Sequence, residues 1–144
     1  MAIRRIDSLG YQIGLLGRLY DRELQDALKK FGVAPGQFAP LVMLFEKDGL
    51  TQADLCRRIN VEQPTMANTL SRMERDDLIV RKPDPNDKRR TLVFLTSKTK
   101  DLQEEIMSAA RSVSAMAMSN LSAPEQGNAF NILSRMIENL DKSR

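Results

Sequence analysis

The sequence contains no histidine, one cysteine and no tryptophan among its 144 residues. A zinc site built on nitrogen and sulfur ligands and a catalytic triad that uses histidine both need side chains that are scarce or missing here. The seven glycines are scattered and form no phosphate-binding loop, and carboxylate pairs such as Glu104 and Glu105 fall on predicted helix surfaces. We therefore expect no catalytic residue, no metal and no cofactor, and we do not expect an enzyme.

Long apolar runs are missing as well. No run of about 18 apolar residues is present that would span a bilayer, and the first residues lack the basic, apolar and small pattern of a secretory leader. A single cysteine cannot form an internal disulfide, which agrees with a reducing compartment. We expect a cytoplasmic protein without a membrane partner, and the 42% of hydrophobic residues suffice for the core of one domain.

Apolar residues at steps of three and four predict two helices in the first third of the chain. The first helix is capped by Asp7 or Ser8 and stops at Gly32, and the second starts at Pro35 and contains Pro40. The apolar face of the first helix consists of Ile6, Leu9, Ile13, Leu16, Tyr20, Leu24 and Leu28, and that of the second of Phe38, Leu41, Val42, Leu44 and Phe45.

A short helix over 51–59, a tight turn and a longer helix over 63–74 follow, which is the spacing of a helix-turn-helix. Thr51 and Asp54 form a predicted capping box for the short helix. The longer helix exposes hydroxyls, amides and one arginine, which suit base edges: Asn and Gln suit adenine, Arg suits guanine and Thr suits thymine. A polar surface helix in an all-α bundle is the alternative. The predicted base-reading residues are Gln63, Thr65, Asn68, Thr69 and Arg72.

Basic residues are concentrated after this helix. Residues 81–100 hold seven cations against two carboxylates, a net charge of +5, so the rest of the chain carries −2 of the total of +3. Strands over 78–82 and 91–95 are predicted to flank a loop that carries Lys88, Arg89 and Arg90. Asp87 is placed to orient Arg89 toward a DNA minor groove, while the other two cations lie against phosphates. A solvated charged loop is the alternative.

The last third predicts two more helices. The fifth helix carries Leu102, Ile106, Ala110, Val113, Ala117 and Leu121, and a capping box at Ser122 and Glu125 opens the sixth. These helices and the first one offer more apolar surface than a small lobe covers, which favours a two-fold dimer over a monomeric bundle. The apolar face of the sixth helix consists of Phe130, Leu133, Ile137 and Leu140.

Over nearly its whole length the chain resembles the MarR family of bacterial transcription regulators. The resemblance is carried by residues 55–59, 63–74 and 76–79, and above all by 84–90 followed by Leu95 and Thr96. It implies a single mainly α domain over 1–144, in which a winged helix-turn-helix lobe (34–97) with a small β-hairpin wing is flanked by helical dimerisation regions (1–31 and 98–144). Glu62, where a capping serine is frequent, and Thr99, where a glycine is frequent, depart from the pattern.

The resemblance also implies a function. A homodimer would bind double-stranded DNA at a palindromic operator through two recognition helices about 34–36 Å apart, with Asp87 and Arg89 in the minor groove. It would act as a repressor that a small, often aromatic, effector releases. By resemblance the effector pocket is lined by the first, second and fifth helices, with these candidates, for which core packing is the alternative: Tyr11, Arg18, Phe38, Val42 and Met107.

Two other hypotheses stay open at the level of sequence. Cys56 would serve an oxidation-sensing regulator if its thiol were exposed and acidic, although its position in the short helix favours packing. A winged-helix module that binds proteins instead of DNA is the second, and its binding to DNA would lack the strong salt dependence of phosphate contacts. The operator, the regulated genes, the effector and the sign of regulation are not encoded in these patterns.

Overall fold

The computed structural model describes residues 7–142, which form helices and one small sheet. Among these residues no helix has the length and apolarity needed to cross a bilayer. The elements in chain order are α1 (Leu9–Leu28), the 3-10 turn η2 (Lys29–Phe31), α2 (Pro35–Glu46), β1 (Leu50–Thr51), α3 (Gln52–Ile59), α4 (Gln63–Arg75), β2 (Ile79–Asp84), β3 (Asp87–Leu95), α5 (Ser97–Asp101), α6 (Gln103–Ala117) and α7 (Ala123–Leu140).

The helix starts agree with the capping residues predicted from the sequence. Ser8 caps α1 by accepting a hydrogen bond from the Tyr11 backbone N–H at 3.3 Å, whereas Ile6 of the predicted apolar face lies outside the described residues. Thr51 and Asp54 form the capping box of α3, in which each side chain accepts the other residue's backbone N–H. Local polar groups therefore set these boundaries.

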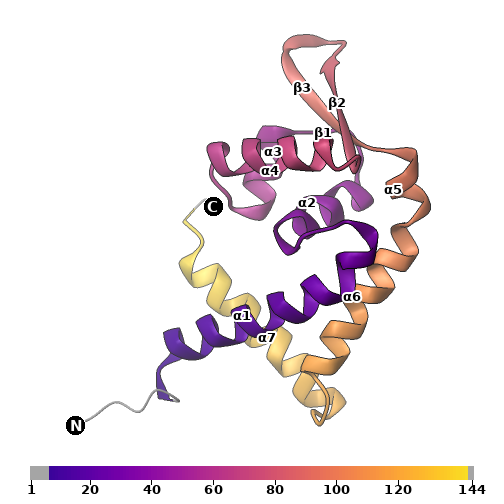
Figure 1. The fold of residues 1–144 in the computed structure, drawn as a ribbon. Helices are drawn as coiled ribbons and strands as arrows, with labels where there is room; N and C mark the ends of the chain where they lie inside the picture. The colour runs from indigo at the N-terminus through magenta and orange to yellow at the C-terminus, as the bar shows by residue number, and fades with distance from the viewer. Residues whose placement is uncertain (1–6, 143–144) are drawn as a thin grey trace.

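Helices α2, α3 and α4 and the sheet form one lobe, and the hairpin of β2 and β3 extends from it beyond all helices (Figure 1). The lobe is held by apolar side chains that are almost fully buried, among them Leu41, Leu44, Leu55, Met66, Leu70, Met73, Leu78 and Val93. The mainly α fold with a winged helix-turn-helix lobe is confirmed.

The sheet has three antiparallel strands in the order β1-β3-β2, so the wing is more than the predicted hairpin. The two-residue strand β1, which the sequence did not reveal, pairs Leu50 with Val93 and Thr51 with Leu92. Gly49, with φ of 74°, turns the chain into β1 and donates its N–H to the Val93 carbonyl at 3.0 Å. Such a short strand has no period of its own, so only pairing across 40 residues defines it.

The predicted loop between the wing strands is wrong in its extent. β2 continues through Asp84 and β3 begins at Asp87, so the turn is only Pro85 and Asn86. Pro83 lies within β2, and its missing N–H is tolerated there because β2 is an edge strand. The three cations at 88–90 thus belong to β3 and not to the loop.

The predicted fifth helix is also divided. Thr96 caps α5, and α6 follows after Leu102 and ends at Ala117, so Leu121 lies outside the helix. Thr99 is fully buried, and its hydroxyl donates to the Leu78 carbonyl at 2.8 Å. A glycine has no hydroxyl for this bond, which explains the threonine at this position.

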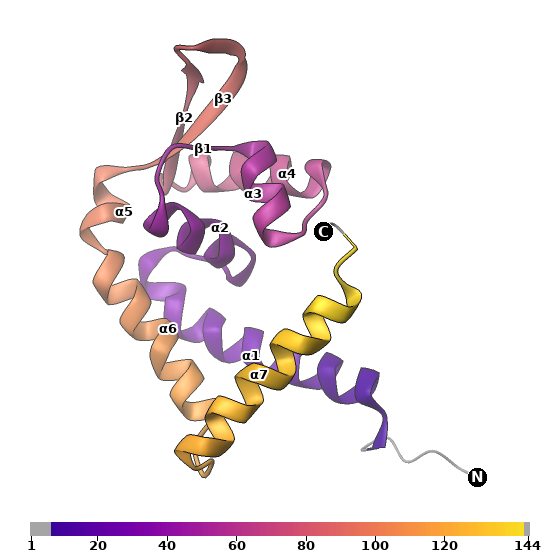
Figure 2. The same cartoon turned by 180° about the vertical axis from the view of Figure 1, so that it is seen from behind.

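The remaining helices, α1, α6 and α7, extend away from the wing (Figure 1). Tyr20 of α1 and Ser114 of α6 share a hydrogen bond between their hydroxyls at 2.8 Å, and Leu24, Leu28, Ile106 and Val113 are buried on these two helices. Helix α7 buries none of its residues. It passes behind α1 in Figure 1 and in front of it in Figure 2.

Candidate nucleic-acid interface

The exposed face of α4 is polar but carries few charges. Gln63, Thr65, Asn68 and Arg72 are exposed, because Met66, Leu70 and Met73 anchor the opposite face in the core. Thr69 is half-buried, and its hydroxyl donates to the Thr65 carbonyl at 2.9 Å. Its proton is therefore used within the helix, and its methyl group and an oxygen lone pair are left for a ligand.

The amino end of α4 has no side-chain cap. Glu62 occupies the capping position without accepting a hydrogen bond there, and Pro64 stands in the first turn. Glu62 therefore interacts with the positive amino end of the helix dipole through its charge and not through a capping hydrogen bond. The negative charge of Glu62 works against a phosphate at this end.

The wing holds Arg89 in a defined orientation through Asp87. One carboxylate oxygen accepts the Arg89 backbone N–H at 3.1 Å and its Nε–H at 3.0 Å, and the other accepts Nη2–H at 3.2 Å. The side-chain hydrogen bonds from Arg89 are the main reason that the pKa of Asp87 lies below its usual range. The Arg89 side chain is nevertheless 90% exposed. The predicted orienting contact is confirmed, and its use in a minor groove stays a prediction.

The three wing cations share an irregular part of the hairpin. Pro83 pairs with Thr91 and Asp84 with Asp87, so Lys88, Arg89 and Arg90 lie between two consecutive pairs without partners on β2. Asp84 is buried, accepts the Asn86 N–H at 2.9 Å and lies 3.7 Å from Arg90 Nε. A bulge of this kind redirects side chains out of the sheet plane, which groups the positive charge.

The other cations of the basic region differ in availability. Arg81 donates Nη2–H to Glu74 at 3.0 Å and is only 29% exposed, so α4 neutralises it. The Nζ of Lys82 lies 5.7 Å from the centre of the Phe94 ring, and Lys100 lies 3.5 Å from Asp48. With Asp84 and Asp87 counted against the three cations at 88–90, residues 84–90 carry a net charge of +1, so the positive potential is shared between the bulge and cations such as Lys82.

A cleft of about 590 Å³ lies between the wing and the helix-turn-helix. It brings together predicted residues (Gln63, Arg89, Arg90) and residues that the sequence did not select. Its most notable contact is between Gln52 and Gln63, where Nε2–H of the former donates to Oε1 of the latter at 2.8 Å. The unselected lining residues are Thr51, Gln52, Ala53, Asp54, Arg57 and Thr91.

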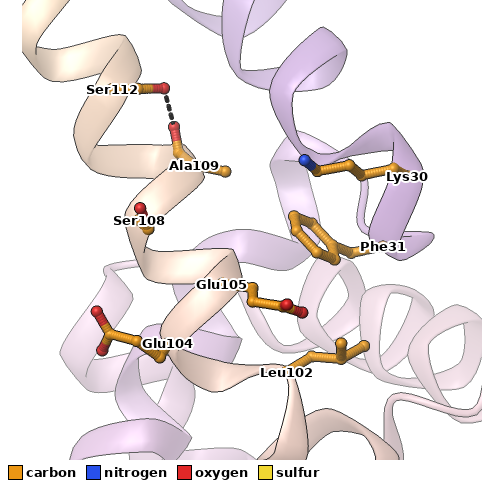
Figure 3. Close-up of a pocket in the computed structure, with 8 residues that line it drawn as sticks. All are labelled: Lys30, Phe31, Leu102, Glu104, Glu105, Ser108, Ala109 and Ser112. Atoms are coloured by element: carbon orange, nitrogen blue, oxygen red, sulfur yellow. Dashed lines mark hydrogen bonds between the residues drawn. The ribbon is translucent and has the colours of Figure 1, made fainter.

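The five candidate effector residues lie on three helices, α1, α2 and α6. Tyr11 and Arg18 are exposed on α1, while Phe38 and Val42 of α2 and Met107 of α6 are half-buried. A cavity of about 730 Å³ lies between η2 and the amino-terminal half of α6. Figure 3 shows its lining, which none of the five candidates joins: Lys30, Phe31, Leu102, Glu104, Glu105, Ser108, Ala109 and Ser112.

Cys56 is buried in the core of the lobe, with 8% of its surface exposed. Its neighbours in the same apolar cluster include Leu55 and Met66. A buried thiol is shielded from oxidants, so its position agrees with the packing interpretation.

Comparison with known proteins identifies relatives of this chain. The MarR family model matches residues 33–91. The chain is 32% identical to the HTH-type transcriptional regulator YwoH of Bacillus subtilis, itself uncharacterized, over 67% of this chain and 69% of YwoH. It is 30% identical to the HTH-type transcriptional repressor NicR of Pseudomonas putida over 71% of this chain, and this alignment spans 65% of NicR.

A solved structure extends the likeness to the whole fold. It is a MarR family regulator from Listeria monocytogenes in complex with a 26mer DNA, with a TM-score of 0.83 and 26% identity over 92% of this chain and 89% of that one. The segment that the MarR family model matches, residues 33–91, contains the α4 face and the wing bulge described above. The chain belongs to the MarR family of transcription regulators, which are DNA-binding proteins and not enzymes.

Proposed function

We propose that this protein is a homodimeric repressor that binds a palindromic operator and leaves it when a small effector binds. The observation that carries the DNA-binding part is the joint presentation of a polar helix face with few charges and an oriented arginine. The face of α4 fits a major groove, and Arg89, held by Asp87, fits the adjacent minor groove. The DNA complex of the relative from Listeria monocytogenes supports this role.

The proposed homodimer rests on helices whose apolar side chains have no cover in the single chain. Leu140 is 77% exposed and Ile137 is 65% exposed, values expected for an interface and not for a free surface helix. A second copy of the chain, related by a two-fold axis, would bury this surface and bring two α4 helices to successive major grooves. The uncovered apolar residues of α1 and α7 are Leu9, Tyr11, Ile13, Leu15, Leu16, Leu19, Phe130, Ile132, Leu133, Ile137 and Leu140.

Repression and release by an effector are carried over from the family. NicR is named a repressor, and this supports the sign of regulation. An effector that binds between the lobe and the long helices would change the distance between the two α4 helices. The five candidates Tyr11, Arg18, Phe38, Val42 and Met107 remain our proposal for its lining.

Selection of bound fragments from genomic DNA by the purified protein tests this function directly. We expect recovered fragments to share an inverted repeat, and their affinity to fall steeply as salt concentration rises. A screen for small molecules that release these fragments would then identify the effector. Recovery of unrelated fragments with no salt dependence would reject the DNA-binding function and favour a protein-interaction module.

A further inference from the structure

The contact between Gln52 and Gln63 connects the two helices of the helix-turn-helix at their amino ends. Each glutamine is the first residue of its helix, α3 and α4 respectively. The Nε2–H of Gln52 donates to Oε1 of Gln63 at 2.8 Å. Gln52 is half-buried in the cleft beside the wing, whereas Gln63 is exposed. The half-buried side chain of Gln52 therefore restrains the exposed side chain of Gln63.

This contact decides which end of the Gln63 amide faces outward. Because Oε1 is directed at Gln52, the Nε2 group with its two N–H donors is turned away from it. A free glutamine would pay rotamer entropy when it binds, and it would present either end of its amide. With Gln52 in place, Gln63 is already oriented as a hydrogen-bond donor.

The position of Gln63 makes its orientation relevant to base recognition. Residues at the amino end of a recognition helix are the ones that contact base edges in the major groove. In that groove guanine offers two acceptors, N7 and O6, whereas thymine offers one acceptor beside its methyl group, adenine offers one acceptor and one donor, and cytosine offers a donor. An outward NH₂ group matches guanine best. The expectation from residue type alone, which paired glutamine with adenine, is revised by this contact.

We propose that Gln52 is a positioning residue that presents Gln63 to DNA as a donor and thereby selects guanine at one position of each half-site. This inference rests on the proposed DNA-binding function. Gln52 itself contacts no base in this arrangement and acts through Gln63.

The decisive variant is Gln52→Glu, which keeps the shape but removes the donor. A carboxylate can only accept, so Gln63 must turn its NH₂ group toward residue 52 and its oxygen toward the DNA. Selection of binding sites from a random duplex library would then show guanine replaced at one position by adenine or cytosine. We expect the ratio of affinities for the guanine site over the substituted site to fall about tenfold or more.

The matched control is Ala53→Glu. Ala53 is exposed and lines the same cleft, so its replacement adds the same charge near the phosphates without touching Gln63. Both variants should lose overall affinity through charge repulsion, but Ala53→Glu should keep the wild-type base preference. Gln52→Ala, which removes the contact without adding charge, should weaken the guanine preference and introduce no new one.

The outcomes separate this inference from the function on which it rests. If the wild-type protein selects no common site, the proposed function fails, and the inference fails with it. If the wild type selects a site but Gln52→Glu and Gln52→Ala keep its base preference at every position, only the role of Gln52 is rejected. The role of Gln52 is also rejected if the loss of binding free energy in the double variant equals the sum of the losses in Gln52→Ala and Gln63→Ala.

Discussion

At the scale of single residues, the main feature of the wing is an arginine that is held in a defined orientation in the protein alone. Asp87 binds Arg89 through three hydrogen bonds within a stretch of three residues. This pairing costs DNA binding little, because the guanidinium retains further N–H donors and remains 90% exposed. The contact was predictable from sequence because its partners are neighbours in the chain.

Arg89→Ala should weaken operator binding about tenfold and lower the slope of log affinity against log salt by about 1. The reason is the loss of one cation from the minor groove. Arg111→Ala is the matched control, since Arg111 is exposed on α6 and paired with Glu104, away from the wing. Titration of labelled operator at several salt concentrations measures both quantities. Unchanged affinity in Arg89→Ala would show that the wing does not contact DNA.

The same pair predicts a shift in acid titration. Since Arg89 lowers the pKa of Asp87, the pair is intact above the ordinary aspartate pKa of about 3.9 and is lost only as pH falls through the depressed value. In Arg89→Ala the pKa of Asp87 should rise toward about 3.9. Following the Asp87 carboxyl carbon by NMR across the acid range measures this. Equal pKa values in the two proteins would mean that the pair does not form in solution.

At the scale of elements, the sequence predicts the helix caps and the apolar faces correctly, but it does not predict where the strands begin and end. The capping residues of α1, α3 and α7 act within three residues, so a local pattern reveals them. β1 depends on pairing with Val93, and the hydroxyl of Thr99 bonds to the Leu78 carbonyl, and both partners lie far away in the chain. Local patterns cannot reveal such partners.

Thr51→Ala should lower the free energy of unfolding by about 1 kcal/mol, because it removes the cap of α3. The change also removes half of a capping box in which the Thr51 backbone N–H lowers the pKa of Asp54. Thr65→Ala is a suitable control, since Thr65 is exposed within the first turn of α4. Urea unfolding followed by circular dichroism measures both. Equal losses in the two variants would contradict a special role for the cap.

At the scale of the whole molecule, the long helices are incomplete in a single chain. Helix α7 has 18 residues and buries none of them, while its apolar side chains are regularly spaced. Burial of apolar surface contributes about 25 cal/mol per Å², so this exposed face is a strong driving force for association. The proposed dimer would cover this face, and it would also meet the geometry of a two-fold operator.

Leu133→Glu combined with Ile137→Glu should dissociate the dimer and reduce operator affinity by about 100-fold or more, because each chain then holds a single half-site. Asn131→Glu is the control: Asn131 is exposed and lies at least 100° around α7 from Phe130, Ile132, Leu133, Ile137 and Leu140, since each residue advances about 100° around a helix. Sedimentation equilibrium should give 16.3 kDa for the double variant and twice this mass for the control. A monomeric wild type would overturn the dimer.

The sequence by itself determined most of the helices, the caps of α1, α3 and α7, the chemistry of the α4 face and the orienting pair in the wing. These features arise from interactions within a few residues or from a repeated period along one element. Only the tertiary structure decided that Arg81 is neutralised by Glu74, that the cations at 88–90 share a bulge, and that Gln52 holds Gln63. Each of these depends on the pairing or approach of separate elements, and no pattern along the chain records that proximity.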